Sequence, residues 1–307
     1  MPITLPPINR RRFLKTATSI GVAACFPFSF IRGEETPPRD PDCFAFLSDT
    51  HIPGDRTTIT NGVNPVDNFR AISKETIAFP DRPASIIVSG DCVHLQGKPE
   101  DYRTLIEELV PVRESGVAVH LVMGNHDERD VFLDACDWAQ PRKEDRPVVE
   151  KQISVVESPK ANWFLLDSLI RTNYTPGKFG TEMLDWLGRE LDKRKDKPAI
   201  LVAHHNLEIE DKEDSNGLID SGAFWKTIIA RPQVKAYVYG HTHVWKTQIR
   251  DGIHLVNVPA TAWKFQQTEP TAWVCAKLRD DGMNLQLRSL DTEHRHHGQK
   301  LELNWRG

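Results

Sequence analysis

Val-Ala-Val-His-Leu-Val-Met-Gly-Asn-His-Asp, at residues 117–127, is the most informative segment of this 307-residue chain. Its first seven residues are mostly apolar and rich in valine, which predicts a short buried strand. Gly124 favours a turn directly after that strand, and Asn125, His126 and Asp127 follow it. The segment therefore predicts a strand whose carboxyl end carries three polar side chains.

Four other apolar runs end in the same way, in side chains of the types that bind metals. The runs and the residues after them are Cys43–Ser48 before Asp49-Thr50-His51, Ser85–Ser89 before Gly90-Asp91, Ala199–Ala203 before His204-His205, and Ala236–Tyr239 before Gly240-His241-Thr242-His243. Each motif alone is typical of a turn or a helix cap. Five of them in this order are hard to explain as turns, because open α/β sheets place their ligands at the carboxyl ends of strands.

Amphipathic stretches lie between these runs and predict helices. The predicted helices span Asp67–Phe79, Glu100–Val112 and Glu182–Leu191, and a further strand is predicted at Asn162–Leu166. Strands that alternate with helices indicate βαβ units and a largely parallel sheet, so the predicted fold class is α/β.

The pattern changes after His243, where apolar runs follow one another with little helix between them. The predicted strands are Val244–Ile249, Ile253–Val258, Thr271–Leu278 and Asn284–Leu290. Asp251-Gly252 and Asp281-Gly282 are turn signals between such runs. We expect these strands to be antiparallel and to complete a second sheet.

The polar residues at the strand ends form a chemically consistent set. Histidine and carboxylate ligands suit manganese, iron and zinc ions. Two such ions ~3.5–4 Å apart need a bridging ligand, and a carboxylate can bridge because it has two oxygens. The five cysteines lack the paired spacing of a structural zinc site, so we expect all except Cys25 to be buried apolar side chains.

The whole series of motifs resembles the calcineurin-like metallophosphoesterase family. The matching residues are Asp49-x-His51, Gly90-Asp91, Gly124-Asn125-His126-Asp127, His204 and Gly240-His241-x-His243. The resemblance implies a four-layer α/β/β/α sandwich of two facing mixed sheets, as one catalytic domain over residues 42–290. It also implies a hydrolase that cleaves a phosphodiester or phosphomonoester. Hydroxide would attack phosphorus, activated by two divalent or trivalent ions of manganese, iron or zinc.

The resemblance further implies a role for each polar residue of the motifs. Seven residues are expected to hold the metals: Asp49, His51 and His243 the first ion, Asn125, His204 and His241 the second, and Asp91 both. His126 is expected beside the substrate, as a proton donor or a stabiliser of phosphoryl charge. Asp127 is expected to orient His126 through a hydrogen bond. His205 adjoins a ligand, so we expect it either to support that ligand through a contact or to pack beside it.

One position departs from the iron-containing purple acid phosphatases, a well-known branch of this family. That branch carries a tyrosine ligand three residues after the bridging aspartate, whereas this chain has His94 there. A bond between iron and tyrosinate is therefore not expected. For His94 itself, an additional ligand, a substrate contact and a residue at the rim of the site all stay open.

The residues that would select a substrate carry a weaker signal. Four residues near the motifs are candidates for contact with a phosphate, and equally for ordinary surface positions: Arg56, Lys98, Tyr102 and Arg129. Trp245, Trp263 and Phe265 follow the last motif, where packing is the simpler expectation. No insertion is long enough for a cap domain, which favours an open groove. The arrangement is most similar to bacterial cyclic-nucleotide and glycerophosphodiester phosphodiesterases of the family.

Charge limits the other functions that the sequence allows. The net charge is −4, and residues 1–32 hold five basic residues and no acidic one, so the rest of the chain is more acidic still. An acidic body is unfavourable for stable nucleic-acid binding and disfavours a nuclease. A protein phosphatase stays open. The alternative from another class is a metal-stabilised protein that binds a phosphorylated ligand without cleaving it, and His126 argues against it because a binder needs no proton donor.

Residues 1–32 resemble a twin-arginine export signal. The basic segment from Arg10 to Lys15 precedes an apolar run from Thr16 to Phe30, which is shorter than the ~20 residues of a membrane span. We therefore expect a periplasmic or extracellular protein without a transmembrane span in its mature form.

Three further features concern the ends of the predicted domain. The segment before Cys25 also resembles a lipoprotein cleavage box, so a lipid anchor at Cys25 is the alternative for the N-terminus. The proline-rich segment 33–41 predicts a linker. Residues 291–307, with three histidines, are expected to form a polar C-terminal tail.

The export prediction can be tested by changing the paired arginines. We expect Arg10→Lys/Arg11→Lys to leave an uncleaved precursor in the cytoplasm, because the export machinery reads the two guanidinium groups rather than their charge. Cell fractionation and immunoblotting measure this, with Arg32→Lys as the control. A double variant that is processed and exported normally would contradict the prediction.

Overall fold

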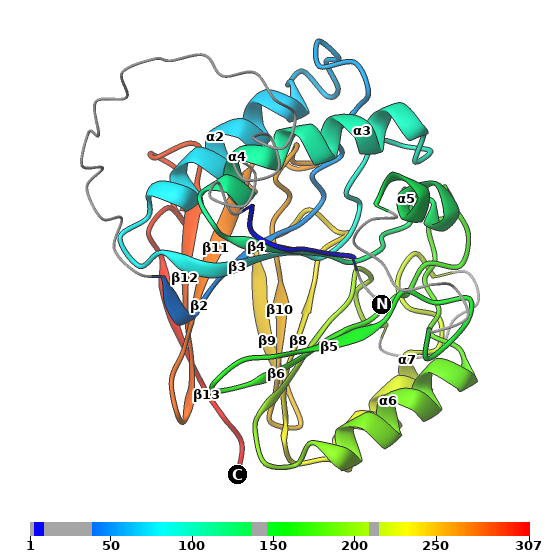
Figure 1. The fold of residues 1–307 in the computed structure, drawn as a ribbon. Coiled ribbons are helices and arrows are strands. Elements are labelled where there is room, and N and C mark those ends of the chain that lie inside the picture. The colour runs from blue at the N-terminus through cyan, green and yellow to red at the C-terminus, as the bar shows by residue number, and fades with distance from the viewer. Residues whose placement is uncertain (1–2, 9–38, 137–145, 209–214) are drawn as a thin grey trace, which may run out of the picture.

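Two facing β-sheets with helices on their outer faces make up the fold (Figure 1). The computed structural model describes residues 3–8, 39–136, 146–208 and 215–307. The arrangement is the predicted four-layer α/β/β/α sandwich. The predicted export signal is described only at residues 3–8, and its arginines and Cys25 lie outside the described residues.

The described residues form a first sheet of seven strands in the order β1-β4-β3-β2-β11-β12-β13. The strands span Ile3–Leu5 (β1), Asp40–Leu47 (β2), Pro83–Val88 (β3), Ala118–Leu121 (β4), Ala272–Leu278 (β11), Gly282–Ser289 (β12) and Lys300–Asn304 (β13). β2, β3 and β4 are parallel to one another, and the remaining pairs are antiparallel. The carboxyl ends of the three parallel strands therefore lie side by side.

The second sheet has six strands within the described residues, in the order β5-β6-β7-β8-β10-β9. They span Ser154–Glu157 (β5), Asn162–Leu165 (β6), Ala199–Val202 (β7), Val234–Tyr239 (β8), Lys246–Arg250 (β9) and Ile253–Asn257 (β10). β6, β7, β8 and β10 are parallel, whereas β5 and β9 run antiparallel at the two edges. Both sheets are thus mixed, as predicted.

Helices pack on the outside of each sheet. The helices are α2 (Pro65–Ala78), α3 (Pro99–Glu108), α4 (Val110–Glu114) and α5 (Arg129–Ala135) on the first sheet, and α6 (Thr181–Lys193) and α7 (Ser221–Ile229) on the second. α2 begins sharply because the Asn64 side chain accepts from the backbone nitrogens of Val66 and Asp67, with Pro65 at the first helical position. Within the described part of the chain, no helix combines the length and apolar character needed to cross a bilayer.

The two sheets meet in an apolar core that the alternation of the strands explains. On β2, Phe44 and Phe46 face the second sheet, whereas Cys43 and Ala45 face the helices. Trp163 of β6 is fully buried between the sheets, with its ring centroid 4.3 Å from that of Phe44. The inner face of each sheet is therefore apolar, which keeps the strand ends in fixed relative positions.

The strands after His243 depart from the prediction. β9 and β10 join the second sheet as expected, but β10 is parallel to β8, and β11 and β12 join the first sheet beside β2. The inner faces of both sheets are equally apolar, so periodicity along one strand does not say which sheet it enters.

The segment 291–307, expected as a tail, contains a strand of the first sheet. β13 pairs antiparallel with β12, and Leu303 enters the core between the sheets. The alternation of apolar and polar residues in β13 spans only five residues and follows a segment rich in histidine and charge, so the sequence pattern does not indicate a strand there. β1 lies in the segment that the sequence analysis assigned to an export signal outside the fold, yet it pairs with β4 and Leu5 is fully buried. The sequence analysis also did not predict β5, α5 and α7, which are short.

The contribution of β13 can be measured with Leu303→Ala. Leu303 is 5% exposed, so the variant should lose about 2–5 kcal/mol of unfolding free energy in denaturant titration. Glu302→Ala on the same strand is the control, because its side chain is 71% exposed, and should change stability by less than about 0.5 kcal/mol. Equal stability of the two variants would show that β13 is not part of the folded core.

Candidate metal centre

The predicted site residues follow five parallel strands that belong to both sheets. Asp49 and His51 follow β2, Asp91 follows β3, Asn125, His126 and Asp127 follow β4, His204 follows β7, and His241 and His243 follow β8. Because the sheets face each other, side chains that are distant in the sequence meet at this end of the sandwich.

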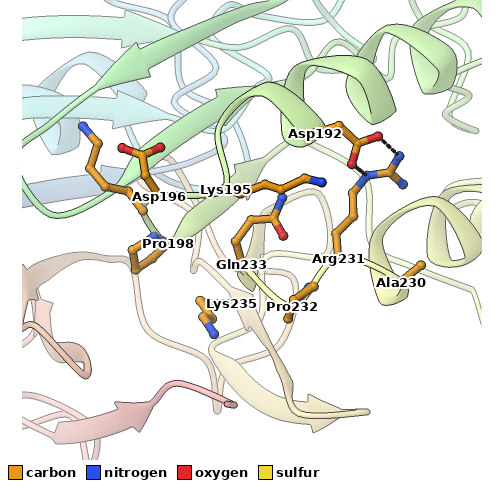
Figure 2. A pocket seen from close by; sticks show the side chains of 10 residues that line it. Asp192, Lys195, Asp196, Pro198, Ala230, Arg231, Pro232, Gln233 and Lys235 are labelled. Atoms are coloured by element: carbon orange, nitrogen blue, oxygen red, sulfur yellow. Dashed lines mark hydrogen bonds and ion pairs between the residues drawn. The ribbon is translucent and has the colours of Figure 1, made fainter.

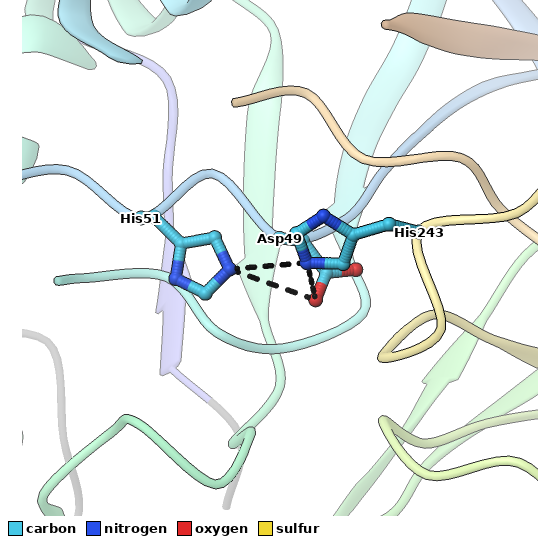
Figure 3. A group of neighbouring side chains, drawn as sticks. All are labelled: Asp49, His51 and His243. Atoms are coloured by element: carbon cyan, nitrogen blue, oxygen red, sulfur yellow. Dashed lines mark hydrogen bonds and ion pairs between the residues drawn. The ribbon is translucent and has the colours of Figure 1, made fainter. Parts of the chain in front are cut away.

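Asp49, His51 and His243 form the first group of candidate ligands (Figure 3). The Nε2 atoms of His51 and His243 are 3.3 Å apart, and Oδ1 of Asp49 lies 3.3 Å from Nε2 of His243. Nε2 of His51 lies 3.9 Å from the same oxygen. All three residues are buried, and their donor atoms lie close enough together to share one ion.

Asp91, His204 and His241 form the second group. Nε2 of His204 lies 3.3 Å from Oδ2 of Asp91 and 3.2 Å from Nδ1 of His241. The amide oxygen of Asn125 lies 3.2 Å from the same His204 nitrogen. The predicted amide ligand therefore lies beside this group.

Asp91 lies between the two groups. Its Oδ2 is 3.8 Å from Nε2 of His51 in the first group and 3.3 Å from Nε2 of His204 in the second. Its Oδ1 accepts a hydrogen bond from the backbone nitrogen of His126 at 2.8 Å. A carboxylate in this position can contact two ions at once.

The hydrogen bonds around the imidazoles indicate which nitrogen faces the centre. Nδ1 of His204, Nε2 of His241 and Nδ1 of His243 each donate to a backbone carbonyl, at 3.0, 2.8 and 2.6 Å. In a neutral imidazole the other nitrogen then carries a lone pair, and these lone pairs face one another within each group. Nitrogens ~2.0–2.1 Å from a shared zinc ion would lie about 3.0–3.4 Å apart, as these do. The residues therefore fit bound cations.

Buried charge in the centre leads to the same conclusion. Burial alone would raise the pKa of Asp49 and Asp91, but the neighbouring imidazoles outweigh it and lower both. Burial lowers the pKa of His51 to about 3 and that of His241 to about 4. Burial also favours a lower pKa for His204, but the negative charges of Asp91 and Asp49 outweigh burial and raise the pKa of His204 to about 9. Ionised carboxylates and neutral imidazoles are the forms that bind metals, so Asp49, Asp91, His51 and His241 already hold the binding form. His204 would have to release its proton when a cation binds.

Five of these residues adopt a backbone conformation that is rare outside glycine. Asp49, His51, Asp91, His241 and His243 have φ angles between 43° and 69°, in the left-handed region. They are five of the nine non-glycine residues with positive φ in the described part of the chain. Such strain costs about 1–3 kcal/mol per residue and clusters at functional sites.

Two glycines allow the loops to approach one another. A Cβ at Gly124 would lie 2.2 Å from both the backbone nitrogen and Oδ1 of Asp91. A Cβ at Gly240 would lie 1.7 Å from Oγ of Ser48, whose hydroxyl donates to Asp49 at 2.5 Å. Both contacts are far shorter than a carbon atom allows, so only glycine fits at either position.

Asp127 does not make the predicted hydrogen bond to His126, although His126 itself lies beside the centre, with Nε2 3.9 Å from Oδ2 of Asp91. Nδ1 of His126 donates to the carbonyl of Leu95 at 2.8 Å, and its side chain is 22% exposed. The buried Asp127 carboxylate instead accepts from the backbone nitrogens of Gly124 at 2.8 Å and Cys92 at 3.2 Å. The bond that orients His126 therefore comes from Leu95, and Asp127 joins the loops after β3 and β4.

Three of the four candidates for a phosphate contact have other partners or are buried. Arg129 donates two hydrogen bonds to the buried Asp167, at 2.7 and 2.9 Å. Arg56 donates to Glu108 at 2.7 Å, and Tyr102 is fully buried. The two arginines therefore serve as ion-pair partners within the fold, and the buried carboxylate of Asp167 would be costly to leave without Arg129.

His94 and His205 lie next to the centre but belong to neither group. Nε2 of His94 lies 3.2 Å from Oγ1 of Thr60, and His94 and Lys98 line a separate hollow. His205 is buried and bonded on both sides, to Oγ of Ser168 at 2.7 Å and to the carbonyl of Thr175 at 2.8 Å. His205 is therefore held by hydrogen bonds beside the centre, and His94 lines a hollow other than the one over the ligand groups.

A pocket of about 530 Å³ opens over both ligand groups. Its walls beyond the motif residues are Thr175, Asn206, Glu208, Asn216, Trp263 and Phe265. The Trp263 ring stacks on His51 with centroids 4.3 Å apart, and the Phe265 ring stacks on His243 at 4.1 Å. Phe265 is also 66% exposed. The polar wall residues were not predicted, because they lie in loops without a recognisable motif.

A second hollow of about 420 Å³ lies at the amino ends of β7 and β8, away from the predicted ligands (Figure 2). Arg231 in its wall donates to Asp192 at 3.1 and 2.7 Å. Gln233 in the same wall donates to the carbonyl of Leu191 at 2.8 Å. None of the predicted site residues lines this hollow.

The order and spacing of these ligand groups identify a known family. A family profile described as calcineurin-like phosphoesterase matches residues 44–245. The chain belongs to this family. Its members' common activity makes the protein a metal-dependent phosphoric ester hydrolase, and the chain offers two ligand groups for the dinuclear metal site of the family.

Relatives of known name cover most of this calcineurin-like phosphoesterase. A 3',5'-cyclic-nucleotide phosphodiesterase of Nostoc is 25% identical over 75% of this chain and 82% of its own length. The 3',5'-cyclic adenosine monophosphate phosphodiesterase CpdA of Haemophilus influenzae is 25% identical over 77% of this chain and 85% of its own. Among solved structures, a dimetal phosphatase from Danio rerio superposes with a TM-score of 0.66 at 15% identity, over 87% of this chain and 100% of that one.

In this metallophosphoesterase, the close approach of two loops requires glycine at position 124, and this requirement can be tested. Gly124→Ala should push Asp91 away from the centre, so the purified protein should retain fewer than two metal ions per chain in elemental analysis. Gly188→Ala is the control, because Gly188 lies inside α6 and its new Cβ would meet only the flexible end of Arg231, at 3.0 Å. Full metal content in Gly124→Ala would contradict the requirement.

Proposed function

We propose that this metallophosphoesterase hydrolyses small phosphodiesters that carry a nucleobase, with 3',5'-cyclic nucleotides as the substrate class. The charge of the pocket wall carries the proposal. None of the described residues that line the pocket is a lysine or an arginine. A phosphomonoester carries up to two negative charges and is commonly bound by arginine or lysine, whereas a diester carries one. This wall therefore favours the diester.

The wall also suits a nucleoside. Phe265 presents an exposed aromatic face next to His243, and a nucleobase gains about 1–3 kcal/mol by stacking on such a face. Asn206, Glu208 and Asn216 supply amide and carboxylate groups that can bond to ribose hydroxyls or to a base edge. The names of the relatives from Nostoc and Haemophilus influenzae support the same substrate class.

The proposed ligands would hold two cations. Asp49, His51 and His243 would bind one ion and Asn125, His204 and His241 the other, with Asp91 between them. Bound cations of manganese, iron or zinc supply charge neutralisation at the phosphoryl oxygens and lower the pKa of water that attacks phosphorus.

His126 is the proposed proton donor. A carbonyl only accepts, so the bond to Leu95 places the Nδ1 proton of His126 outward and leaves Nε2 facing the pocket. When protonated, Nε2 can donate to the departing ribose oxygen or bind a phosphoryl oxygen. Asp127 supports this from a distance, because it fixes the turn after β4 on which His126 sits.

We further propose that the protein acts after export, because the arginine-rich segment and apolar run of residues 1–32 resemble a twin-arginine signal. A reaction outside the cytoplasm would act on substrate arriving from the surroundings or released by the cell.

Steady-state kinetics with manganese or zinc test the proposed activity. We expect kcat/KM for 3',5'-cyclic AMP to exceed that for 5'-AMP, because the pocket wall lacks the cations that a dianion needs. His126→Ala should lower kcat for the cyclic nucleotide about 10²–10⁴-fold with metal content unchanged. Asp91→Ala should lose both metal and activity, and His294→Ala is the control, because His294 lies outside the pocket.

Two outcomes would contradict the proposal. A preference for monoesters would show that the pocket wall does not select by charge. Retention of two ions without turnover of any mono- or diester would favour a binding protein over an enzyme.

A further inference from the structure

His51 differs from the other three imidazoles of the centre. His204, His241 and His243 each donate their outer nitrogen to a backbone carbonyl. Nδ1 of His51 is buried and has no hydrogen-bond partner among the described residues. A metal-binding histidine usually relies on such a bond for its orientation, so another contact must fix the His51 ring.

The Trp263 indole makes that contact. Its ring lies 4.3 Å from the His51 ring, centroid to centroid, at an interplanar angle of only 17°. Trp263 is 6% exposed, so neither ring can move far without opening the core. The backbone carbonyl of the same residue accepts from Nδ1 of His243 at 2.6 Å. Trp263 therefore touches two of the three residues in the first group.

Backbone hydrogen bonds hold the tryptophan in place. The backbone nitrogens of Thr261 and Ala262 donate to the carbonyls of Ser48 and Asp49, at 2.8 and 3.1 Å. The side chain of Asn68 in α2 donates to the carbonyl of Ala262 at 2.7 Å. The segment before Trp263 is thus hydrogen-bonded to the loop that carries Asp49 and His51. These bonds fix the position of the indole relative to the His51 imidazole.

We propose that Trp263 is the positioning residue of the first metal: its indole orients His51 by stacking, and its carbonyl orients His243 by a hydrogen bond. The stack suits a metal ligand, because an imidazole bound to a cation becomes electron-poor and the face of an indole is electron-rich. The proposal concerns metal binding and holds whichever phosphoester is the substrate.

Metal-binding measurements on the substrate-free protein test the role of Trp263. In Trp263→Leu the backbone carbonyl stays and the aromatic face is lost. We expect the affinity for one of two Zn²⁺ ions to fall about 10–100-fold in competition with a chelator, with the other ion unaffected. Trp263→Phe keeps a stacking face and should restore most of that affinity. In Co²⁺-substituted protein, Trp263→Leu should alter the visible absorption of one of the two ions.

Trp245→Leu is the matched control. Trp245 is a buried tryptophan of the core between the sheets, 8% exposed, whose Nε1 donates to Gln299 at 2.9 Å. It should lose stability and keep both ions at wild-type affinity. If Trp263→Leu does not fold, Trp263→Met takes its place in the comparison with Trp263→Phe.

Three results would overturn the proposal. Wild-type affinity for both ions in Trp263→Leu would show that His51 needs no stacking partner. Equal loss in Trp263→Phe and Trp263→Leu would show that stacking is not the cause. Equal loss in Trp245→Leu and Trp263→Leu would reduce the effect to general destabilisation.

Discussion

Two buried carboxylates, Asp49 and Asp91, face imidazole nitrogens within 4 Å, and much of the molecule serves to keep them there. Oδ1 of Asp49 has no hydrogen-bond partner among the described residues. Buried charge of this kind is costly unless a cation or a donor compensates it. The strained backbone, the two close glycines and the imidazole lone pairs all lie around these carboxylates. Bound metal ions would compensate the buried negative charge there.

The sandwich explains how such a centre can form. Parallel strands of the first sheet bring Asp49, Asp91 and Asn125 to one end, and parallel strands of the second bring His204 and His241 to the same end. The apolar core between the sheets holds these two sets of loops at a fixed separation. Each ligand group combines loops from both sheets, so neither sheet alone supplies a complete group.

The chain between the two sheets also shapes the site. After β10 it crosses back to the first sheet, and the crossing segment carries Trp263 against His51 and Phe265 against His243. This one connection leads into β11 of the first sheet, contacts the first ligand group and forms the aromatic wall of the pocket. The polar part of the wall comes from the loops around Thr175, Asn206 and Asn216. The pocket therefore joins a charged floor to a partly aromatic rim in which no described residue is a lysine or an arginine.

The order of the ligand motifs was readable in the sequence, because each follows a short apolar strand and a metal site restricts which side chains can stand there. The four layers followed from the same motifs through the family resemblance. Which sheet receives β11 and β12 was not readable, since both inner faces are apolar and only three-dimensional packing distinguishes them. The predicted partner of His126, Asp127, was wrong, because the carbonyl of Leu95 takes that place. Leu95 contributes a carbonyl, which every residue possesses, so only the path of the backbone after β3 decides that it meets this imidazole.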